Sequence, residues 1–146
     1  MNLFSMLDIS GSALKAERER AEVVASNLAN AETTHSAEGG PYQRREVVFA
    51  AKALPEQGFA HALAAASDVV VRGVRVERVM TDPTPPLRRY EPSHQDADAD
   101  GYVGYPAINP IEEMVDLMGA ARAYQLNVAA VQSTKAMILQ SLQIVS

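Results

Sequence analysis

The acidic segment between residues 96 and 103 has spacing similar to that of a metal site. Carboxylates at alternate positions, then a glycine and an apolar residue, match the first eight positions of an EF-hand calcium loop. These residues are Asp96, Asp98, Asp100, Gly101 and Val103. The twelfth position of such a loop holds a bidentate Glu, but here it is Ala107, and Glu112 comes five residues late. The favoured interpretation is an acidic turn in which the glycine takes a positive φ.

The histidines do not form a recognisable catalytic or metal-binding set. His35, His61 and His94 lie in predicted loops and lack the spacing of metal ligands. His94 and Asp96 resemble an acid–base pair, but no turn carrying a nucleophile accompanies them. Phosphate-binding glycine loops, HExxH and GxSxG are absent from the sequence, and so is cysteine. We therefore predict a protein that is not an enzyme and uses no cofactor or metal.

The composition is that of an ordinary globular chain with few aromatic residues. Its 146 residues are 47% hydrophobic and 21% charged, with three Phe, five Tyr and no Trp, so helix packing by smaller side chains is expected. Residues 44–89 hold eight bases and five acids, too mixed for a nucleic-acid surface, whereas residues 91–116 hold seven acids and no base. No secretory signal and no membrane-spanning run of about 18 apolar residues is recognised.

The last part of the chain predicts one long helix from Asn109 to the end. At about 1.5 Å per residue it would be about 54 Å long. Apolar residues recur there at steps of three and four, and only Lys135 interrupts the stripe. The stripe comprises Met114, Leu117, Ala121, Tyr124, Val128, Val131, Ile138, Leu142 and Val145. We expect it to pack first on the amino-terminal helix and then on other molecules.

The outer positions of this long helix are weakly polar. After Asp116 its only charges are Arg122 and Lys135, which indicates contacts on several sides and not a solvated face. Arg122 and Tyr124 have two interpretations. They form a simple surface pair, or they reach the acidic 91–116 segment of a neighbouring molecule.

A shorter helix is predicted from Ser5 to Asn30, with Asn30 as its carboxy-terminal cap. Apolar residues one heptad apart suit packing on the long helix; they are Leu7, Leu14, Ala21 and Leu28. Asn27 is either a polar residue at a helix end or an amide that pairs across helices and fixes their register. The chain leaves along one helix, forms a small β-rich module and returns along the other, so the two helices are expected to run antiparallel if they pack together.

The middle of the chain predicts a small β-rich module. Strands are expected at residues 42–50, at residues 68–82 with a bulge at Gly73, and at residues 87–90 and 102–105. The stretch Phe59–Ala66 is ambiguous between a short helix and a loop. The predicted fold class is mainly α with a small β-rich insert, in an elongated subunit. Residues 1–31 and 109–146 form a coiled-coil-like antiparallel pair, and residues 32–108 form an outer module.

Several long motifs resemble one family. Asn27-Leu28-Ala29-Asn30 followed by Thr33-Thr34 is similar to the amino-terminal signature of flagellar rod and hook proteins. The segments GGPYQRREVVF, YEPSHQDADADGYVGYP and EEMVDLMGAARAYQLNVAAVQSTKAM resemble the proximal rod proteins of the bacterial flagellar basal body, the FlgC family. The resemblance covers most of the chain. Gln95 and Ala107 depart from the family pattern, which usually has Pro and Asn there.

The resemblance implies a structural subunit of the rod, the drive shaft that crosses the periplasm. In that family the paired terminal helices form an inner tube and the β region lies outside it. The implied partners are other flagellar rod proteins, copies of the same chain and the flagellar type III export apparatus, without a cleaved signal peptide, nucleic acid or membrane insertion. It also favours Asn27 and Asn30 as assembly contacts. The alternatives are a soluble coiled-coil homo-oligomeric binding module and a calcium-binding loop protein.

Overall fold

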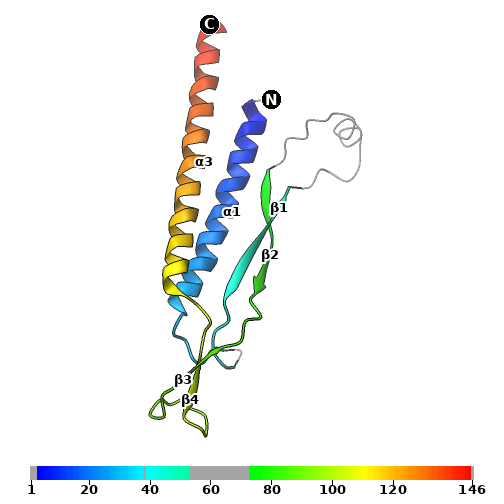
Figure 1. Ribbon diagram of the computed structural model, residues 1–146. Coiled ribbons are helices and arrows are strands. Elements are labelled where there is room, and N and C mark those ends of the chain that lie inside the picture. The colour runs from blue at the N-terminus through cyan, green and yellow to red at the C-terminus, as the bar shows by residue number, and fades with distance from the viewer. Residues whose placement is uncertain (1–2, 38, 53–72, 146) are drawn as a thin grey trace, which may run out of the picture.

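Two helices enclose a β-rich segment in the order of the chain (Figure 1). The computed structural model describes residues 3–37, 39–52 and 73–145. Helix α1 spans Leu3–Ala29 and helix α3 spans Pro110–Val145. The strands are β1 Arg45–Ala51, β2 Val74–Thr81, β3 Leu87–Tyr90 and β4 Tyr102–Tyr105. The predicted class, mainly α with a small β-rich insert, is confirmed. The ambiguous stretch Phe59–Ala66 lies outside the described residues.

Helix α1 lies between α3 and the β1–β2 hairpin, and it contacts α3 and both strands of the hairpin (Figure 1). The two helices run antiparallel, so both chain ends lie at one end of the molecule, and β3 and β4 lie at the opposite end. Helix α3 extends past the beginning of α1. Its last turns therefore have no part of α1 beside them.

An asparagine side chain caps each helix at the end that adjoins the β-rich segment. The Asn30 amide Nδ2 donates to the Ser26 carbonyl at 2.8 Å, as does its backbone N–H at 3.1 Å. Asn30 thus satisfies a carbonyl at the end of α1, as predicted. At the start of α3, the Asn109 Oδ1 accepts the Ile111 N–H at 3.1 Å, and Pro110 occupies the first helical position. Proline suits that position because its missing N–H would have no helical partner there.

The buried face of α3 coincides only in part with the predicted stripe. The buried positions of α3 are Glu113, Ala120 and Thr134, which are separated by multiples of seven. The predicted stripe includes the residues that follow two of them, Met114 and Ala121, which are exposed. Its members Leu117, Val131 and Ile138 are half-buried. The pattern of large apolar residues does not reveal these buried positions, because an alanine and two polar residues occupy them. On α1, Ala16 and Val24 are the matching buried apolar residues.

The β1–β2 hairpin packs on α1 through a close approach at Gly73. A Cβ at Gly73 would lie 2.3 Å from the Ser12 Oγ, and that hydroxyl accepts the Val74 N–H at 3.0 Å. The predicted bulge at Gly73 is wrong. The register instead shifts opposite Val48 and Phe49, where Glu77 of β2 has no partner. The glycine is needed for space beside α1, a requirement that local strand patterning does not reveal.

Strands β3 and β4 pair antiparallel, and their predicted ranges are confirmed. The guanidinium of Arg88 lies 4.8 Å from the ring centroid of Tyr102, and that of Arg89 lies 4.6 Å from Tyr105. Tyr90 packs edge-on against Tyr102 at 5.4 Å. These cation–π and aromatic contacts cover a ribbon that has only two strands and needs such support for stability.

Candidate assembly site

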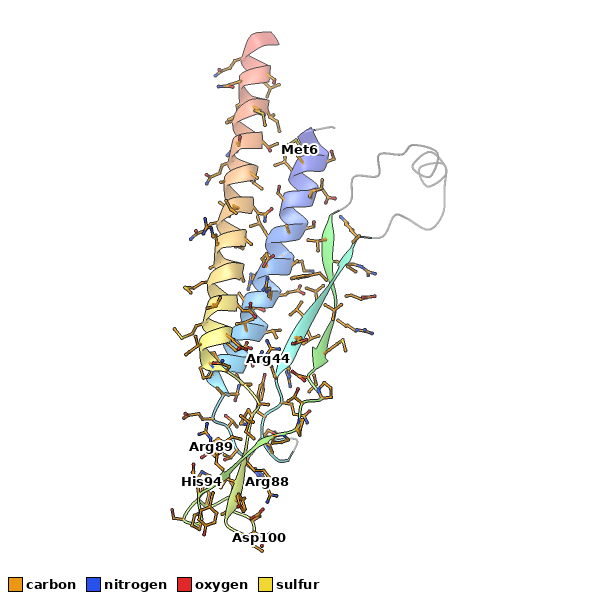
Figure 2. All side chains as sticks on the ribbon, in the orientation of Figure 1. Met6, Arg44, Arg88, Arg89, His94 and Asp100 are labelled. Atoms are coloured by element: carbon orange, nitrogen blue, oxygen red, sulfur yellow. The ribbon has the colours of Figure 1, made fainter. Side chains whose placement is uncertain are left out.

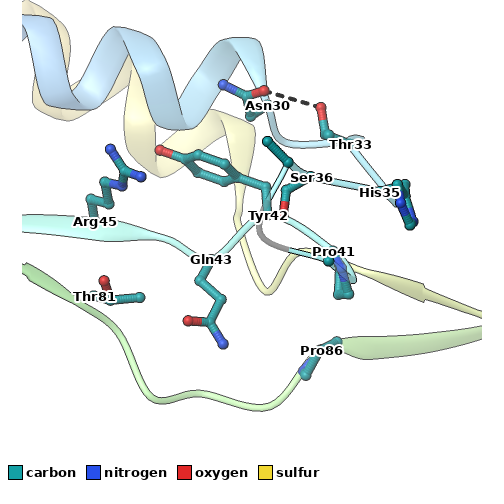
Figure 3. Close-up of a pocket in the computed structure, with 12 residues that line it drawn as sticks. Asn30, Thr33, His35, Ser36, Pro41, Tyr42, Gln43, Arg45, Thr81 and Pro86 are labelled. Carbon is teal, nitrogen blue, oxygen red and sulfur yellow. Dashed lines mark hydrogen bonds between the residues drawn. The ribbon is translucent and has the colours of Figure 1, made fainter.

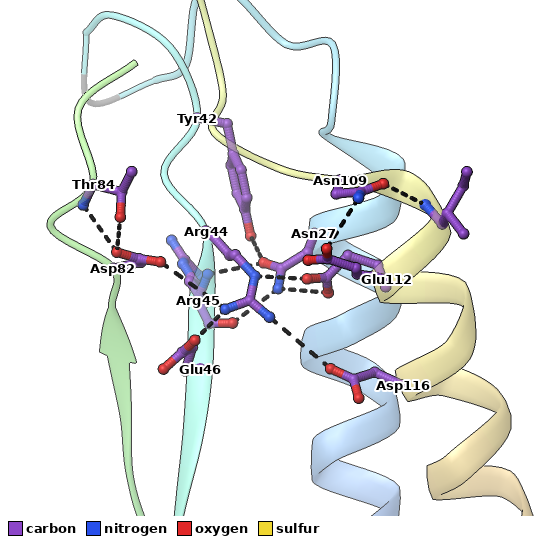
Figure 4. A network of polar contacts seen from close by, with 12 residues as sticks. Asn27, Tyr42, Arg44, Arg45, Glu46, Asp82, Thr84, Asn109, Glu112 and Asp116 are labelled. Carbon is purple, nitrogen blue, oxygen red and sulfur yellow. Dashed lines mark hydrogen bonds and ion pairs between the residues drawn. The ribbon is translucent and has the colours of Figure 1, made fainter. Parts of the chain in front are cut away.

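Asn27 is the hub of a polar cluster between α1, α3 and the start of β1 (Figure 4). Its side chain is 0% exposed. The amide Nδ2 donates to the Glu113 Oε2 at 3.0 Å and to the Arg45 carbonyl at 2.8 Å. The Oδ1 accepts the Arg45 N–H at 2.9 Å and the Tyr42 hydroxyl at 3.1 Å. One amide therefore pairs with the backbone of β1 and also reaches across to α3.

Glu113 carries a charge at the buried centre of this cluster. It is 1% exposed, and its Oε1 accepts the Arg44 Nε at 2.6 Å. Removing a carboxylate from water is costly unless a cation and hydrogen bonds compensate, and here both are present. Glu113 thus depends on Arg44 and Asn27 together.

Arg44 joins the cluster to further acids. Its guanidinium hydrogen-bonds Glu46 and lies 4.0 Å from a carboxylate oxygen of both Asp82 and Asp116. Burial acts to lower the pKa of Arg44, but hydrogen bonds and charge attraction from Glu113 and Glu46 outweigh it, so the pKa is raised above its ordinary value. Arg44 therefore remains a permanent cation between three segments of the chain.

A second ion pair spans the two helices directly. The Arg20 Nη2 of α1 lies 3.3 Å from the Asp116 Oδ1 of α3. Together with the Asn27–Glu113 bond, it fixes how far α3 is shifted along α1. Glu113 and Arg44 were not predicted as site residues. The sequence feature that could have indicated Glu113 is its spacing of seven residues from Ala120, which places both on one face of α3.

The outward side of α3 carries an exposed apolar face near its amino-terminal end. Five large side chains there are between 54% and 72% exposed, and no element of the described chain covers them. They are Ile111, Met114, Val115, Met118 and Leu126, which we call the α3 outer face. Arg122 is exposed at the same helical spacing, and no ion pair to it occurs among the described residues. Methionine-rich apolar faces of this kind adapt readily to a partner surface.

The structure divides the predicted packing residues into three groups. Asn27 is fully buried within the chain, whereas half-buried positions are Leu7, Leu14, Ala21, Leu28, Asn30, Leu117, Val128, Val131 and Ile138. Exposed positions are Met114, Ala121, Arg122, Tyr124 and Leu142. Val145 belongs to α3, but its side chain lies outside the described part. The exposed group is covered only in part by the rest of the described chain, from Tyr124 at 41% exposed to Leu142 at 63% among its large apolar members.

Internal hydrogen bonds use most of the acidic segment's carboxylates. Asp96 accepts the Thr34 hydroxyl at 2.7 Å, and Asp98 pairs with Arg88 at 2.5 Å. The Asp98 Oδ1 also accepts two backbone N–H groups within the turn. Gly101 has a φ of 79°, as expected for an acidic turn. Across the described chain, no group of three or more potential ligand residues is placed to hold a metal ion.

The histidines are not brought together. The His94 Nδ1 accepts the Asp96 N–H at 3.1 Å, and its ring packs edge-on against Tyr105, so it holds the turn. His35 is exposed, and His61 lies outside the described residues. The Tyr105 hydroxyl donates to Glu91 at 2.9 Å, which raises the pKa of Tyr105 because ionisation would lose that bond and place two anions together.

Comparison with known proteins identifies the family. The family model for flagella basal body rod proteins matches residues 7–34, and that for the flagellar basal body rod FlgEFG protein C-terminal region matches residues 99–144. These matched segments include most of α1 and nearly all of α3. In the described part of the chain, neither helix combines the length and hydrophobicity needed to cross a bilayer.

Full-length relatives agree with these matches. The flagellar basal-body rod protein FlgC of Yersinia enterocolitica is 38% identical over 142 residues, covering 97% of both chains. FlgC of Bacillus subtilis is 37% identical over 148 residues, covering 99% of both. FlgC of Borreliella burgdorferi is 35% identical over 157 residues, covering 99% of this chain and 98% of the relative. The chain therefore belongs to the FlgC family of flagellar basal-body rod proteins.

Proposed function

We propose that this noncatalytic rod subunit polymerises with other rod proteins and with copies of itself into the periplasmic drive shaft that transmits torque. The observation that supports this most is the α3 outer face. It exposes five large apolar residues on a helix that already packs on α1 by its opposite side. Burying such a face against neighbours removes apolar surface from water, which favours association by about 25 cal/mol for each Å².

The proposal includes the arrangement of the two parts of the subunit. Residues 1–31 and 109–146 form an elongated, coiled-coil-like pair in the inner tube, and residues 32–108 lie outside it. The antiparallel helices support this arrangement, since both chain ends lie together and away from β3 and β4 (Figure 1). Torque transmission needs many stiff parallel contacts and no chemistry, and long helices provide them.

Immunogold electron microscopy of purified basal bodies tests the main proposal. An antibody against the wild-type chain should label the rod. Labelling elsewhere in the flagellum, or none, would refute it. A soluble homo-oligomeric binding module, the alternative function, would sediment as a discrete oligomer and leave the basal bodies unlabelled.

Arg122→Glu tests whether the α3 outer face is used. We propose that Arg122 meets an acidic surface of a neighbour, so reversal should reduce incorporation into rods while leaving the folded β-rich segment intact. Arg78→Glu is the matched control, because Arg78 is also exposed but lies on β2. Equal incorporation of the two variants would exclude this role for Arg122.

The proposal also includes export through the flagellar type III apparatus without cleavage. Amino-terminal sequencing of the chain recovered from basal bodies should begin at Met1 or Asn2. A start further into α1 would indicate proteolytic processing and contradict this part.

A further inference from the structure

Arg122 lies in the middle of the α3 outer face. Met118 comes one turn before it and Leu126 one turn after it, so exposed apolar side chains flank the charge on both sides. No partner for its guanidinium occurs within the described chain. A cation is costly to bury without an anion, so a molecule that covers this face needs an acidic group opposite Arg122.

Gly119 leaves an open space beside Arg122, which we call the Gly119 gap. The two residues are three positions apart on α3 and are therefore neighbours on the helix surface. Gly119 is exposed, and a Cβ there would meet nothing within 4 Å. Packing inside the described chain thus does not require a glycine, although glycine weakens a helix relative to alanine. The gap suits a bulky side chain of a neighbouring molecule.

The turn between β3 and β4 presents an anion and an aromatic ring side by side. Asp100 lies at the end of the molecule opposite the chain termini (Figure 2) and is exposed. Neither a hydrogen bond nor an ion pair engages its carboxylate within the part of the chain that the structure describes. Tyr90 is 66% exposed, and a Cβ at Gly101 would lie 2.9 Å from its ring, so the ring is adjacent to Asp100. Asp98 holds the turn by accepting the N–H groups of Asp100 and Tyr102.

A cleft of about 630 Å³ near the end of α1 is the alternative place for an acidic turn to bind (Figure 3). The cation in its wall is Arg45, whose guanidinium lies 5.7 Å from the ring centroid of Tyr42. Arg45 therefore already interacts within its own chain. The Tyr42 hydroxyl and the Asn30 side chain are also hydrogen-bonded there, to Asn27 and Thr33. The α3 outer face is thus the better acceptor.

We propose that the α3 outer face of one copy receives the β3–β4 turn of a second copy. Asp100 then pairs with Arg122, and the Tyr90 ring occupies the Gly119 gap. The charge and the ring are neighbours on the turn, as Arg122 and the gap are on α3, so both contacts form in one docking. The methionines of the α3 outer face suit an aromatic ring, because thioether sulfur packs favourably against it. The inference rests on the proposed function and names the acidic surface that Arg122 meets.

The position of the turn decides how the two copies are related. Strands β3 and β4 lie beyond the start of α3 (Figure 1), so the turn of one copy reaches a copy that is displaced along the direction of the helices. The two surfaces are different, which makes the contact heterologous. It therefore repeats from copy to copy instead of closing a symmetric dimer.

A charge swap in the full-length chain tests the ion pair. Asp100→Arg and Arg122→Glu should each lower incorporation into rods at least about fivefold, because each replaces an attraction by a repulsion. The two substitutions combined should restore incorporation. The control combines Asp100→Arg with Arg78→Glu, which reverses an exposed charge on β2 and should restore nothing. Failure of the swapped chain to exceed both single variants overturns the inference.

Gly119→Gln tests the gap separately from folding. Glutamine favours a helix more than glycine does, so the midpoint of thermal unfolding should stay the same or rise. The new side chain fills the gap, and incorporation should fall at least about fivefold, as for an overpacked contact. Ala121→Gln is the control, because Ala121 is exposed on another side of α3 and both properties should be kept. Normal incorporation of Gly119→Gln would overturn the inference.

Disulfide cross-linking in basal bodies identifies the partner, since the chain has no cysteine of its own. Gln125→Cys places a thiol one turn from Arg122 without changing the apolar face, and Ala99→Cys places one beside Asp100. With both substitutions in one chain, mild oxidation should yield a ladder of dimers and higher multimers on a non-reducing gel. Replacing Ala99→Cys by Glu77→Cys, at an exposed position on β2, should give no ladder.

The outcomes separate the inference from the proposed function. Rods that contain the wild-type chain, with no ladder beyond the control, leave the function standing and overturn the contact. Cross-linking of Ala99→Cys only to a different rod protein also overturns it, because the partner is then not a second copy. Absence of the wild-type chain from rods overturns the proposed function itself.

Discussion

Glu113 and Asn27 show how single buried polar residues define this molecule. Neither has the apolar character expected of a core residue, yet both are almost fully buried where α1, α3 and the start of β1 meet. The hydrogen bonds of these two residues are directional. They therefore specify one alignment of α1 and α3, whereas apolar contacts alone would tolerate several. The Asn27 amide thus pairs across two helices of the same chain, through its hydrogen bond to Glu113. That leaves its side chain unavailable to a neighbouring molecule.

Glu113→Ala should lower the free energy of unfolding by about 2–4 kcal/mol, because it leaves buried donors on Asn27 and Arg44 without an acceptor. Urea unfolding followed by circular dichroism measures this. The control is Glu22→Ala, which breaks only an exposed pair with Arg18 on α1 and should cost less than about 0.5 kcal/mol. Similar losses in both variants would mean that the polar cluster contributes little.

The acidic turn should respond to pH through Asp98. The pKa of Asp98 lies below its ordinary 3.8. The hydrogen bond from the Tyr102 N–H lowers it most, and those from Arg88 and the Asp100 N–H add to this, so that together they outweigh desolvation. A lowered folded pKa means that stabilisation is present above the ordinary value and is lost as the pH falls through the folded value. The Tyr102 amide signal in NMR should therefore shift only below about pH 4. Asp98→Asn should abolish this shift, and persistence of the shift would contradict the assignment.

Two glycines with similar φ should differ in their tolerance of a side chain. Gly101→Ala should cost about 1–3 kcal/mol, because the backbone is strained and the new Cβ meets Tyr90 at 2.9 Å. Gly39→Ala has the same backbone problem with nothing within 4 Å, so its loss should be smaller. Thermal unfolding of both variants gives the comparison. A larger loss for Gly39→Ala would show that crowding at Gly101 is unimportant.

At the scale of elements, the position of α3 on α1 is decided by small and polar residues. The predicted stripe followed the largest apolar side chains, several of which face outward. Ala120 is 1% exposed, and the Thr134 hydroxyl donates to the Ala130 carbonyl at 2.9 Å, which allows the burial of Thr134. The existence and length of the helix could be predicted from the sequence, but only part of its packing face could.

Adjacent alanines test this face directly. Ala120→Leu should destabilise the protein by about 1–3 kcal/mol, since its Cβ is buried between the helices and a larger side chain overpacks the contact. Ala121→Leu, one residue along on the exposed side, should change stability by less than about 0.5 kcal/mol. A larger loss of stability for Ala121→Leu than for Ala120→Leu in chemical denaturation would show that Ala121, as in the predicted stripe, faces α1.

At the scale of the whole molecule, intrachain packing uses one side of α3, and the side proposed for assembly is left exposed. The Glu113 side of α3 is occupied by α1, and the α3 outer face is left open. This separation lets the subunit fold before it polymerises. It also predicts that changes on the α3 outer face alter the proposed assembly without altering folding.

Met118→Lys should therefore separate the two properties. Met118 is 64% exposed, so the free energy of unfolding should change by less than about 0.5 kcal/mol. Incorporation into rods, measured by quantitative mass spectrometry of basal bodies, should fall strongly because a charge would be buried in the contact. Normal incorporation would show that this face stays exposed to solvent in the rod.

The sequence by itself determined the two helices, the positions of the strands, the acidic turn and, through its motifs, the family. These features depend on local periodicity, turn chemistry and patterns that each lie within one segment. The tertiary structure alone decided the face of α3, the space needed at Gly73 and the buried Asn27–Glu113–Arg44 cluster. Each of these joins segments far apart in the chain, and their geometry depends on distances that no local pattern encodes.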